Sequence, residues 1–149
     1  IFQTCGQPEV RRTRKRIYGG SKATRGQHPW MAPLQRQTPD GNEHFCGGVL
    51  IRSCWVLTAA HCLENPQTEI QVALGKQNLK TKEDHEQIFD AVQRILHGKY
   101  REKALLKLQP VDGYCVVETK YVKIACVPDF FLPVGTSCFT SGWGETETG

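Results

Sequence analysis

The sequence has 149 residues, of which 39% are hydrophobic and 23% charged. This composition indicates a globular domain with one hydrophobic core and excludes a disordered chain. No apolar stretch within these residues is long enough to span a bilayer, so we expect no membrane span. The net charge of +4 is mildly basic. The chain begins at Ile1 without an apolar leader, which favours a processed chain or a fragment.

Seven cysteines are many for this length. They indicate metal or redox chemistry inside the cell or disulfides outside it. Cys46, Cys54 and Cys62 are spread evenly along strand-like sequence, and no close pair resembles a zinc site, so we favour disulfides. We therefore expect a secreted, extracellular protein with no metal and no cofactor. The odd count leaves one cysteine without a partner.

Short strand-like segments separated by turns predict an all-β barrel or sandwich. The predicted strands are residues 30–35, 45–51, 55–58, 69–74, 105–108, 116–122 and 138–140. Residues 39–41, Pro-Asp-Gly, predict a turn, and the glycine pair at 47–48 is expected to permit close approach of another backbone. Between residues 87 and 96, apolar side chains recur at helical spacing, so this pattern alone predicts a helix.

Residues 55–62, Trp-Val-Leu-Thr-Ala-Ala-His-Cys, are the most informative segment. An apolar run ends in His61 and Cys62, which predicts a titratable ring at the end of a buried strand. With other segments in the same order, the chain resembles the trypsin/chymotrypsin family of serine endopeptidases. Those segments are 16–20 (Arg-Ile-Tyr-Gly-Gly), 28–30 (His-Pro-Trp), 45–48 (Phe-Cys-Gly-Gly), 104–108 (Ala-Leu-Leu-Lys-Leu) and 141–144 (Ser-Gly-Trp-Gly).

The resemblance implies a trypsin-like double β-barrel of roughly 200–250 residues, of which this chain holds the first barrel and the start of the second. Residues 1–16 would be a basic linker or activation segment and residues 17–149 a partial protease domain. The family fold also implies a strand over residues 87–96, and we adopt strand over helix. The disulfides implied by the family are Cys5–Cys126, Cys46–Cys62 and Cys54–Cys115, with Cys138 unpaired.

The family's chemistry needs a hydroxyl nucleophile, an imidazole that takes its proton, a carboxylate that orients the imidazole, and oxyanion donors. The resemblance assigns the imidazole, as general base, to His61. Glu102 and Lys103 stand where the family has Asp-Ile. Glu102 is the candidate stand-in for the orienting aspartate, but it is one methylene longer, and misplacement by about 1 Å costs about a hundredfold in rate. The alternative is that both are solvated loop residues.

The family's Gly-Asp-Ser-Gly-Gly segment does not occur among the 149 residues, and with it the serine nucleophile is absent. Ser137 and Ser141 are not substitutes, because neither is flanked by glycines on both sides. We therefore expect a serine-type endopeptidase by resemblance, acting on protein substrates after Arg or Lys, whereas this stretch alone is not expected to catalyse. The alternative is a truncated, non-catalytic protease-like binding module.

The bond between Arg16 and Ile17 resembles the family's activation cleavage site. A basic run precedes it, made up of Arg11, Arg12, Arg14, Lys15 and Arg16. This run is a solvated linker, a contact for polyanions such as heparin-like chains or nucleic acid, or a processing site for a protease that prefers basic residues. We favour processing, because Lys15-Arg16 suits a trypsin-like activator, and one run can serve two purposes.

Overall fold

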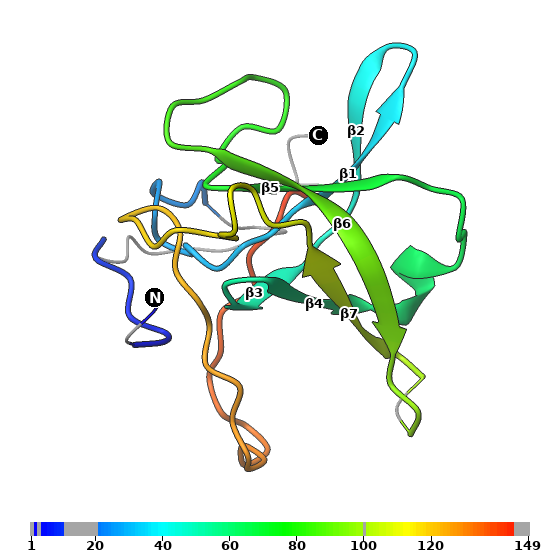
Figure 1. The fold of residues 1–149 in the computed structure, drawn as a ribbon. Coiled ribbons are helices and arrows are strands. Elements are labelled where there is room, and N and C mark those ends of the chain that lie inside the picture. The colour runs from blue at the N-terminus through cyan, green and yellow to red at the C-terminus, as the bar shows by residue number, and fades with distance from the viewer. Residues whose placement is uncertain (1, 3, 11–20, 100, 145–149) are drawn as a thin grey trace.

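The computed structural model describes residues 2, 4–10, 21–99 and 101–144, and regular structure in this part of the chain is nearly all strand (Figure 1). One short 3-10 helix, η1 (Ala60–Leu63), interrupts the strands. The strands are β1 (Leu34–Thr38), β2 (Gly41–Cys46), β3 (Val49–Arg52), β4 (Trp55–Ala59), β5 (Ile70–Leu74), β6 (Gln87–Leu96) and β7 (Lys103–Leu108). The predicted all-β fold class is confirmed.

The strands form one antiparallel sheet in the order β2-β1-β5-β6-β7-β4-β3. Its two ends meet, because Met31 just before β1 forms a bridge with Val49 of β3. The N–H of Ala32 donates to the Gly48 carbonyl at 2.9 Å, and the N–H of Leu50 donates to the Trp30 carbonyl at 2.8 Å. The sheet therefore closes into a barrel, and the hairpin of β1 and β2 extends beyond it (Figure 1).

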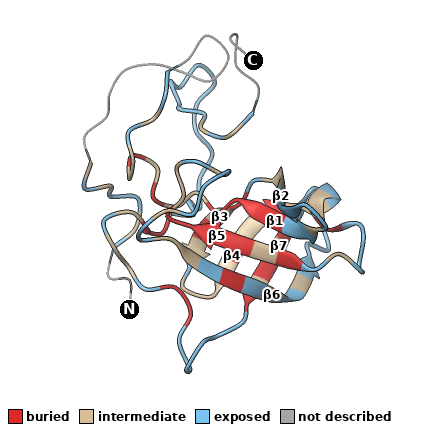
Figure 2. Cartoon of the chain, turned by 90° about the horizontal axis from the view of Figure 1, so that it is seen from above, coloured by how far each residue is buried: buried red, intermediate tan, exposed pale blue. Residues whose placement is uncertain are grey.

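The hydrophobic core fills the inside of this barrel (Figure 2). In β7 the inward residues Ala104, Leu106 and Leu108 are buried, whereas Lys103 and Lys107 lie on the other face, as the two-residue period of a strand requires. The other strands contribute inward side chains in the same way. Fully buried members of the core include Ala32, Leu34, Leu50, Val56, Val72, Leu74, Leu106 and Leu108.

Residues 87–96 form strand β6, and the helical spacing of their apolar side chains has a physical cause. Ala91 lies opposite Leu108 of β7, but the next pair on this face is Arg94 with Leu106, because the register shifts between Ala91 and Gln93. An extra residue in one strand reverses the alternation of side chains beyond it. The bulge thus produces an apolar pattern that imitates a helix, and the preference for a strand was correct.

The predicted strand at 45–51 is two strands, since β2 ends at Cys46 and β3 begins at Val49. A Cβ atom on Gly48 would lie 2.7 Å from Val56 and 2.9 Å from the Ala32 carbonyl oxygen, so only glycine fits. No such contact exists at Gly47, so the expected close approach applies to one glycine of the pair. The turn predicted at residues 39–41 is present between β1 and β2.

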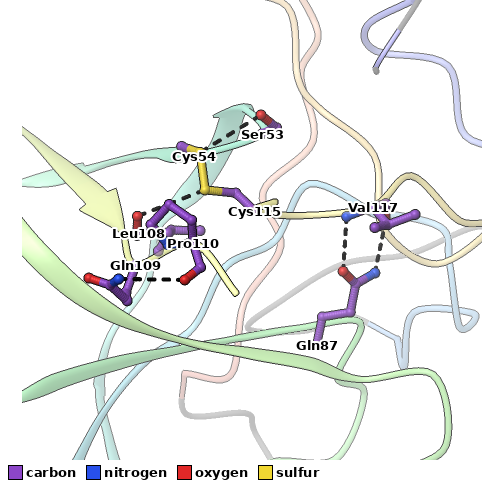
Figure 3. Close-up of a disulfide and its surroundings, with 8 residues drawn as sticks. All are labelled: Ser53, Cys54, Gln87, Leu108, Gln109, Pro110, Cys115 and Val117. Atoms are coloured by element: carbon purple, nitrogen blue, oxygen red, sulfur yellow. Dashed lines mark hydrogen bonds between the residues drawn. A yellow bond between two sulfur atoms is a disulfide. The ribbon is translucent and has the colours of Figure 1, made fainter. Parts of the chain in front are cut away.

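Two predicted strands and one boundary were wrong. Residues 116–122 contain only an isolated bridge. Gln87 takes both backbone groups of Val117, donating at 2.8 Å and accepting at 3.0 Å (Figure 3), so this residue is not available for a strand ladder. Residues 138–140 are irregular and exposed, and no described strand pairs with them. The first strand begins at Leu34 rather than at residue 30, after Pro33, which has no N–H to donate.

The segment after the barrel carries several apolar side chains in solvent. Phe131 is 99% exposed, and Phe130, Leu132, Val134 and Phe139 are also exposed. In Figure 1 this orange segment extends away from the sheet. An exposed apolar cluster of this kind is an aggregation risk. The described residues contain no helix with the length and apolar character of a membrane span.

Candidate active site

His61 lies in η1, directly after strand β4. Val56 in β4 and Leu63 at the end of η1 are both buried in the core, at 0% and 6% exposure. Ala59, the residue before η1, is still extended (φ −85°, ψ 143°), so the chain changes direction at Ala60. Because the residues on both sides are anchored inward, the His61 side chain is left at the surface.

The Cys46–Cys62 disulfide joins the end of β2 to η1 beside His61, with 6.2 Å between the two Cα atoms. A ring nitrogen of His61 and the two sulfur atoms lie within 4.8 Å of one another. These atoms do not make a metal centre, because sulfurs bonded to each other are not the thiolates that coordinate metal ions. The bridge instead restrains the backbone next to the imidazole.

Glu102 reaches the histidine segment through its backbone and not through its carboxylate. The N–H of Ala60 donates to the Glu102 carbonyl at 2.8 Å, one residue before His61. The Glu102 side chain is exposed and forms no hydrogen bond or ion pair with the His61 ring. Lys103 begins β7 opposite Ala59 and lies on the exposed face of the strand, so its charge has no desolvation cost.

The two serines of the last segment form no hydrogen bond with the imidazole. Ser137 is exposed, and the hydroxyl of Ser141 donates to the Met31 sulfur at 3.5 Å. Among the described residues, no hydroxyl is hydrogen-bonded to the His61 ring. The structure therefore places an exposed imidazole at the end of a strand, with no nucleophile paired to it in this part of the chain.

A second histidine, His44, lies in β2, where its partly buried ring packs against Trp143. The two rings lie 5.7 Å apart, edge to face, and the indole N–H of Trp143 donates to the Gln77 carbonyl at 2.8 Å. Burial lowers the pKa of His44, and a hydrogen bond with the Leu34 backbone offsets only part of this shift. This histidine is therefore held neutral to lower pH than an exposed one.

The predicted cleavage site at Arg16–Ile17 and the basic run at 11–16 lie outside the described residues. The arm before them packs against the segment that follows β7, where the Gly6 N–H donates to the Ile124 carbonyl at 2.8 Å. Lys123, which is 11% exposed, pairs with Glu9 of the arm at 3.0 Å and with Glu118 at 3.4 Å. The arm thus forms an ordered contact with the segment that follows the barrel.

Three disulfides cross-link the described residues, in the pairs that the family resemblance implied. Cys5–Cys126 ties the arm to the chain after the barrel, and Cys54–Cys115 ties the β3–β4 turn to the segment after β7, with Cα–Cα distances of 5.0 and 5.2 Å. The Ser53 hydroxyl lies against this second bridge (Figure 3). Cys138 is free and exposed.

Sequence reasoning missed one residue beside the histidine segment, Arg94. Its guanidinium donates to three backbone carbonyls from the end of η1 to the residues before β5, those of Leu63, Asn65 and Thr68. No sequence motif marks it, because its direction depends on the bulge in β6. The sequence offers no signal for it, because β6 also contains Gln87, Asp90 and Gln93, so an arginine in this strand does not stand out.

The fold and the site define a disulfide-braced antiparallel β-barrel protein with an exposed histidine at the end of a core strand. The family model described as Trypsin matches residues 17–149. The chain therefore belongs to the trypsin family of serine proteases.

Similarity to individual curated proteins supports the same family membership. The chain is 36% identical to the urokinase-type plasminogen activator of Gallus gallus over 98% of its own length and 37% of that protein. It is 37% identical to the tissue-type plasminogen activator of Mus musculus over 97% and 28%. It is 33% identical to the hepatocyte growth factor activator serine protease of Mus musculus over 99% and 24%. The chain thus spans between 24% and 37% of the length of these relatives.

Proposed function

We propose that this chain is part of a secreted serine-type endopeptidase zymogen that cleaves protein substrates after Arg or Lys. The observation that carries the proposal is the match to the trypsin family over residues 17–149, together with His61 at the end of β4. His61 would act as general base, taking the proton of a serine supplied by a part of the protein outside residues 1–149, and returning it to the leaving amine.

We further propose that cleavage between Arg16 and Ile17 activates the zymogen. The basic residues before this bond suit a trypsin-like activator, and this supports the proposal. Within the family we propose a close relationship to hyaluronan-binding protein 2, also called factor VII-activating protease, on the basis of residues 108–115 and 120–123. A polyanion contact through Arg11, Arg12, Arg14, Lys15 and Arg16 is a further proposal that rests on charge alone.

One observation favours a second candidate, a non-catalytic protease-like binding module. The carboxylate of Glu102 is exposed and does not contact His61, and loss of the orienting carboxylate in this kind of site lowers kcat by about 10⁴. This alternative predicts no turnover of peptide substrates, whether or not the chain is cleaved at Arg16.

The two candidates are separated by assaying the full-length protein on a chromogenic Arg-type peptide before and after treatment with a trypsin-like activator. The endopeptidase proposal expects turnover only after cleavage, at least about a thousandfold less turnover in His61→Ala, and no activation of Arg16→Gln. His28→Ala serves as the matched histidine control and is expected to retain activity. Turnover equal in the wild type and His61→Ala would eliminate this assignment.

A further inference from the structure

Arg94 faces the inside of the barrel because of the bulge in β6. Directly opposed residues of an antiparallel pair share one face of the sheet. Ala91 opposes Leu108, and after the register shift Arg94 opposes the buried Leu106. Without the extra residue, position 93 would take this place. The bulge therefore turns a guanidinium group towards the chain that leaves η1.

The guanidinium bridges three carbonyls of one short segment. One terminal nitrogen, Nη1, donates to the Asn65 carbonyl at 2.7 Å and to the Leu63 carbonyl at 3.4 Å, and Nη2 donates to the Thr68 carbonyl. Hydrogen bonds from a charged donor are stronger than neutral ones, and the planar fork of an arginine serves several acceptors at once. Lysine, a single point charge, cannot replace this arrangement.

The first of these carbonyls belongs to Leu63, the last residue of η1, two residues after His61. Before the histidine, Ala60 is held by the carbonyl of Glu102, and directly after it Cys62 is held by its disulfide. Beyond η1, the described backbone bonds of residues 64–69 are a local turn within the segment, such as that from the Thr68 N–H to the Asn65 carbonyl at 3.3 Å. Within the part of the chain that the structure describes, Arg94 is the side chain whose hydrogen bonds join this segment to the sheet between its buried ends, Leu63 and Ile70.

We propose that Arg94 is a positioning residue for His61, holding the C-terminal end of η1 so that the imidazole keeps the geometry needed for proton transfer. The inference rests on the proposed endopeptidase function. Release of the segment would let the ring shift, and misplacement by about 1 Å costs about a hundredfold in rate. Arg94 touches neither substrate nor reacting atoms, so its loss lowers kcat and leaves KM nearly unchanged.

The test uses the full-length protein with Arg94→Met, Arg94→Lys and the matched control Arg52→Met. Arg52 also donates to a backbone carbonyl, that of Ile51, but lies at the opposite end of β4 from His61. We expect Arg94→Met to lower kcat by about 10- to 100-fold with KM within about twofold. The kcat of Arg94→Lys should lie between those of Arg94→Met and the wild type, and the kcat of Arg52→Met should equal that of the wild type.

Two readouts do not depend on activity. Hydrogen exchange of residues 64–69 should accelerate in Arg94→Met, and nuclear relaxation should show a more mobile His61 ring. Faster exchange with an unchanged ring would reduce Arg94 to a loop anchor and overturn the inference, as would an unchanged kcat in an active enzyme. A wild-type protein with no turnover would refute the proposed function, while the ring measurement would still decide the role of Arg94.

Discussion

An ion pair between Lys76 and Glu86 closes the loop that connects β5 and β6. The Lys76 ammonium lies 2.9 Å from the Glu86 carboxylate, and the side chains are only 6% and 7% exposed. Lys76 also donates to the Thr81 carbonyl at 2.5 Å, and Glu86 accepts from the Glu83 N–H at 3.3 Å. These neutral partners cannot replace the opposite charge, so each ion depends on the other.

We expect Glu86→Gln to lower the free energy of unfolding by about 3–5 kcal/mol, because it leaves the Lys76 charge buried without its counter-charge. Lys76→Met should cost a similar amount by stranding the carboxylate. The double variant Lys76→Met/Glu86→Leu removes both charges and should lie within about 1 kcal/mol of the wild type, since apolar residues of similar volume replace buried ion pairs at little cost. Urea unfolding with the disulfides intact measures all three values.

The pair between Arg36 and Glu43 is the matched control, because it has a similar distance of 2.8 Å but side chains that are 47% and 51% exposed. Glu43→Gln should cost less than about 1 kcal/mol. The reasoning is refuted if Glu86→Gln costs no more than Glu43→Gln, or if the double variant costs the sum of the two single changes.

Two further predictions concern pH. Burial lowers the pKa of Lys123, but hydrogen bonds and charges from Glu9 and Glu118 outweigh burial and raise it. The stabilisation that the Lys123 charge gives is therefore complete below about pH 10.4, the ordinary pKa of lysine in the unfolded chain, and is lost at higher pH. In a plot of urea midpoint against pH, Lys123→Met should therefore flatten the decline on the alkaline side. Burial lowers the pKa of His44, so stability falls as the pH drops below about 6.5, and His44→Gln should flatten the acid limb. Limbs that superimpose on the wild type would contradict either prediction.

The parts of the fold that sequence predicted are those where local pattern and tertiary environment agree. The apolar residues that alternate at 70, 72 and 74 meet the core as expected, and the predicted strand at 105–108 lies within β7. Residues 87–96 needed the family resemblance, because a bulge changes the phase of the pattern and cannot be seen without the partner strand. Residues 116–122 have strand-like composition, yet they form only an isolated bridge, and the backbone groups of Val117 bond a side chain, that of Gln87.

The candidate site, like the fold, was predictable from the sequence only in part. The place of His61 follows from an apolar run that ends in a small, anchored turn. The relation of Glu102 to it was not predictable, because the contact is made by a carbonyl, which every residue carries. The role of Arg94 was not predictable either, because its direction depends on the bulge in β6 and its three carbonyl acceptors leave no signature in the sequence.

The Cys5–Cys126 bridge has a consequence for how the molecule refolds. In the intact chain it closes a loop with a sequence separation of 121 residues and stabilises the fold mainly by limiting the unfolded chain. If the bond between residues 16 and 17 is cut, as proposed, that loop opens and the bridge becomes the covalent link between two polypeptides. After reduction, reassembly is then a bimolecular reaction whose yield depends on protein concentration. In the uncut chain the arm and the barrel are covalently linked, so their reassembly is intramolecular and does not depend on concentration.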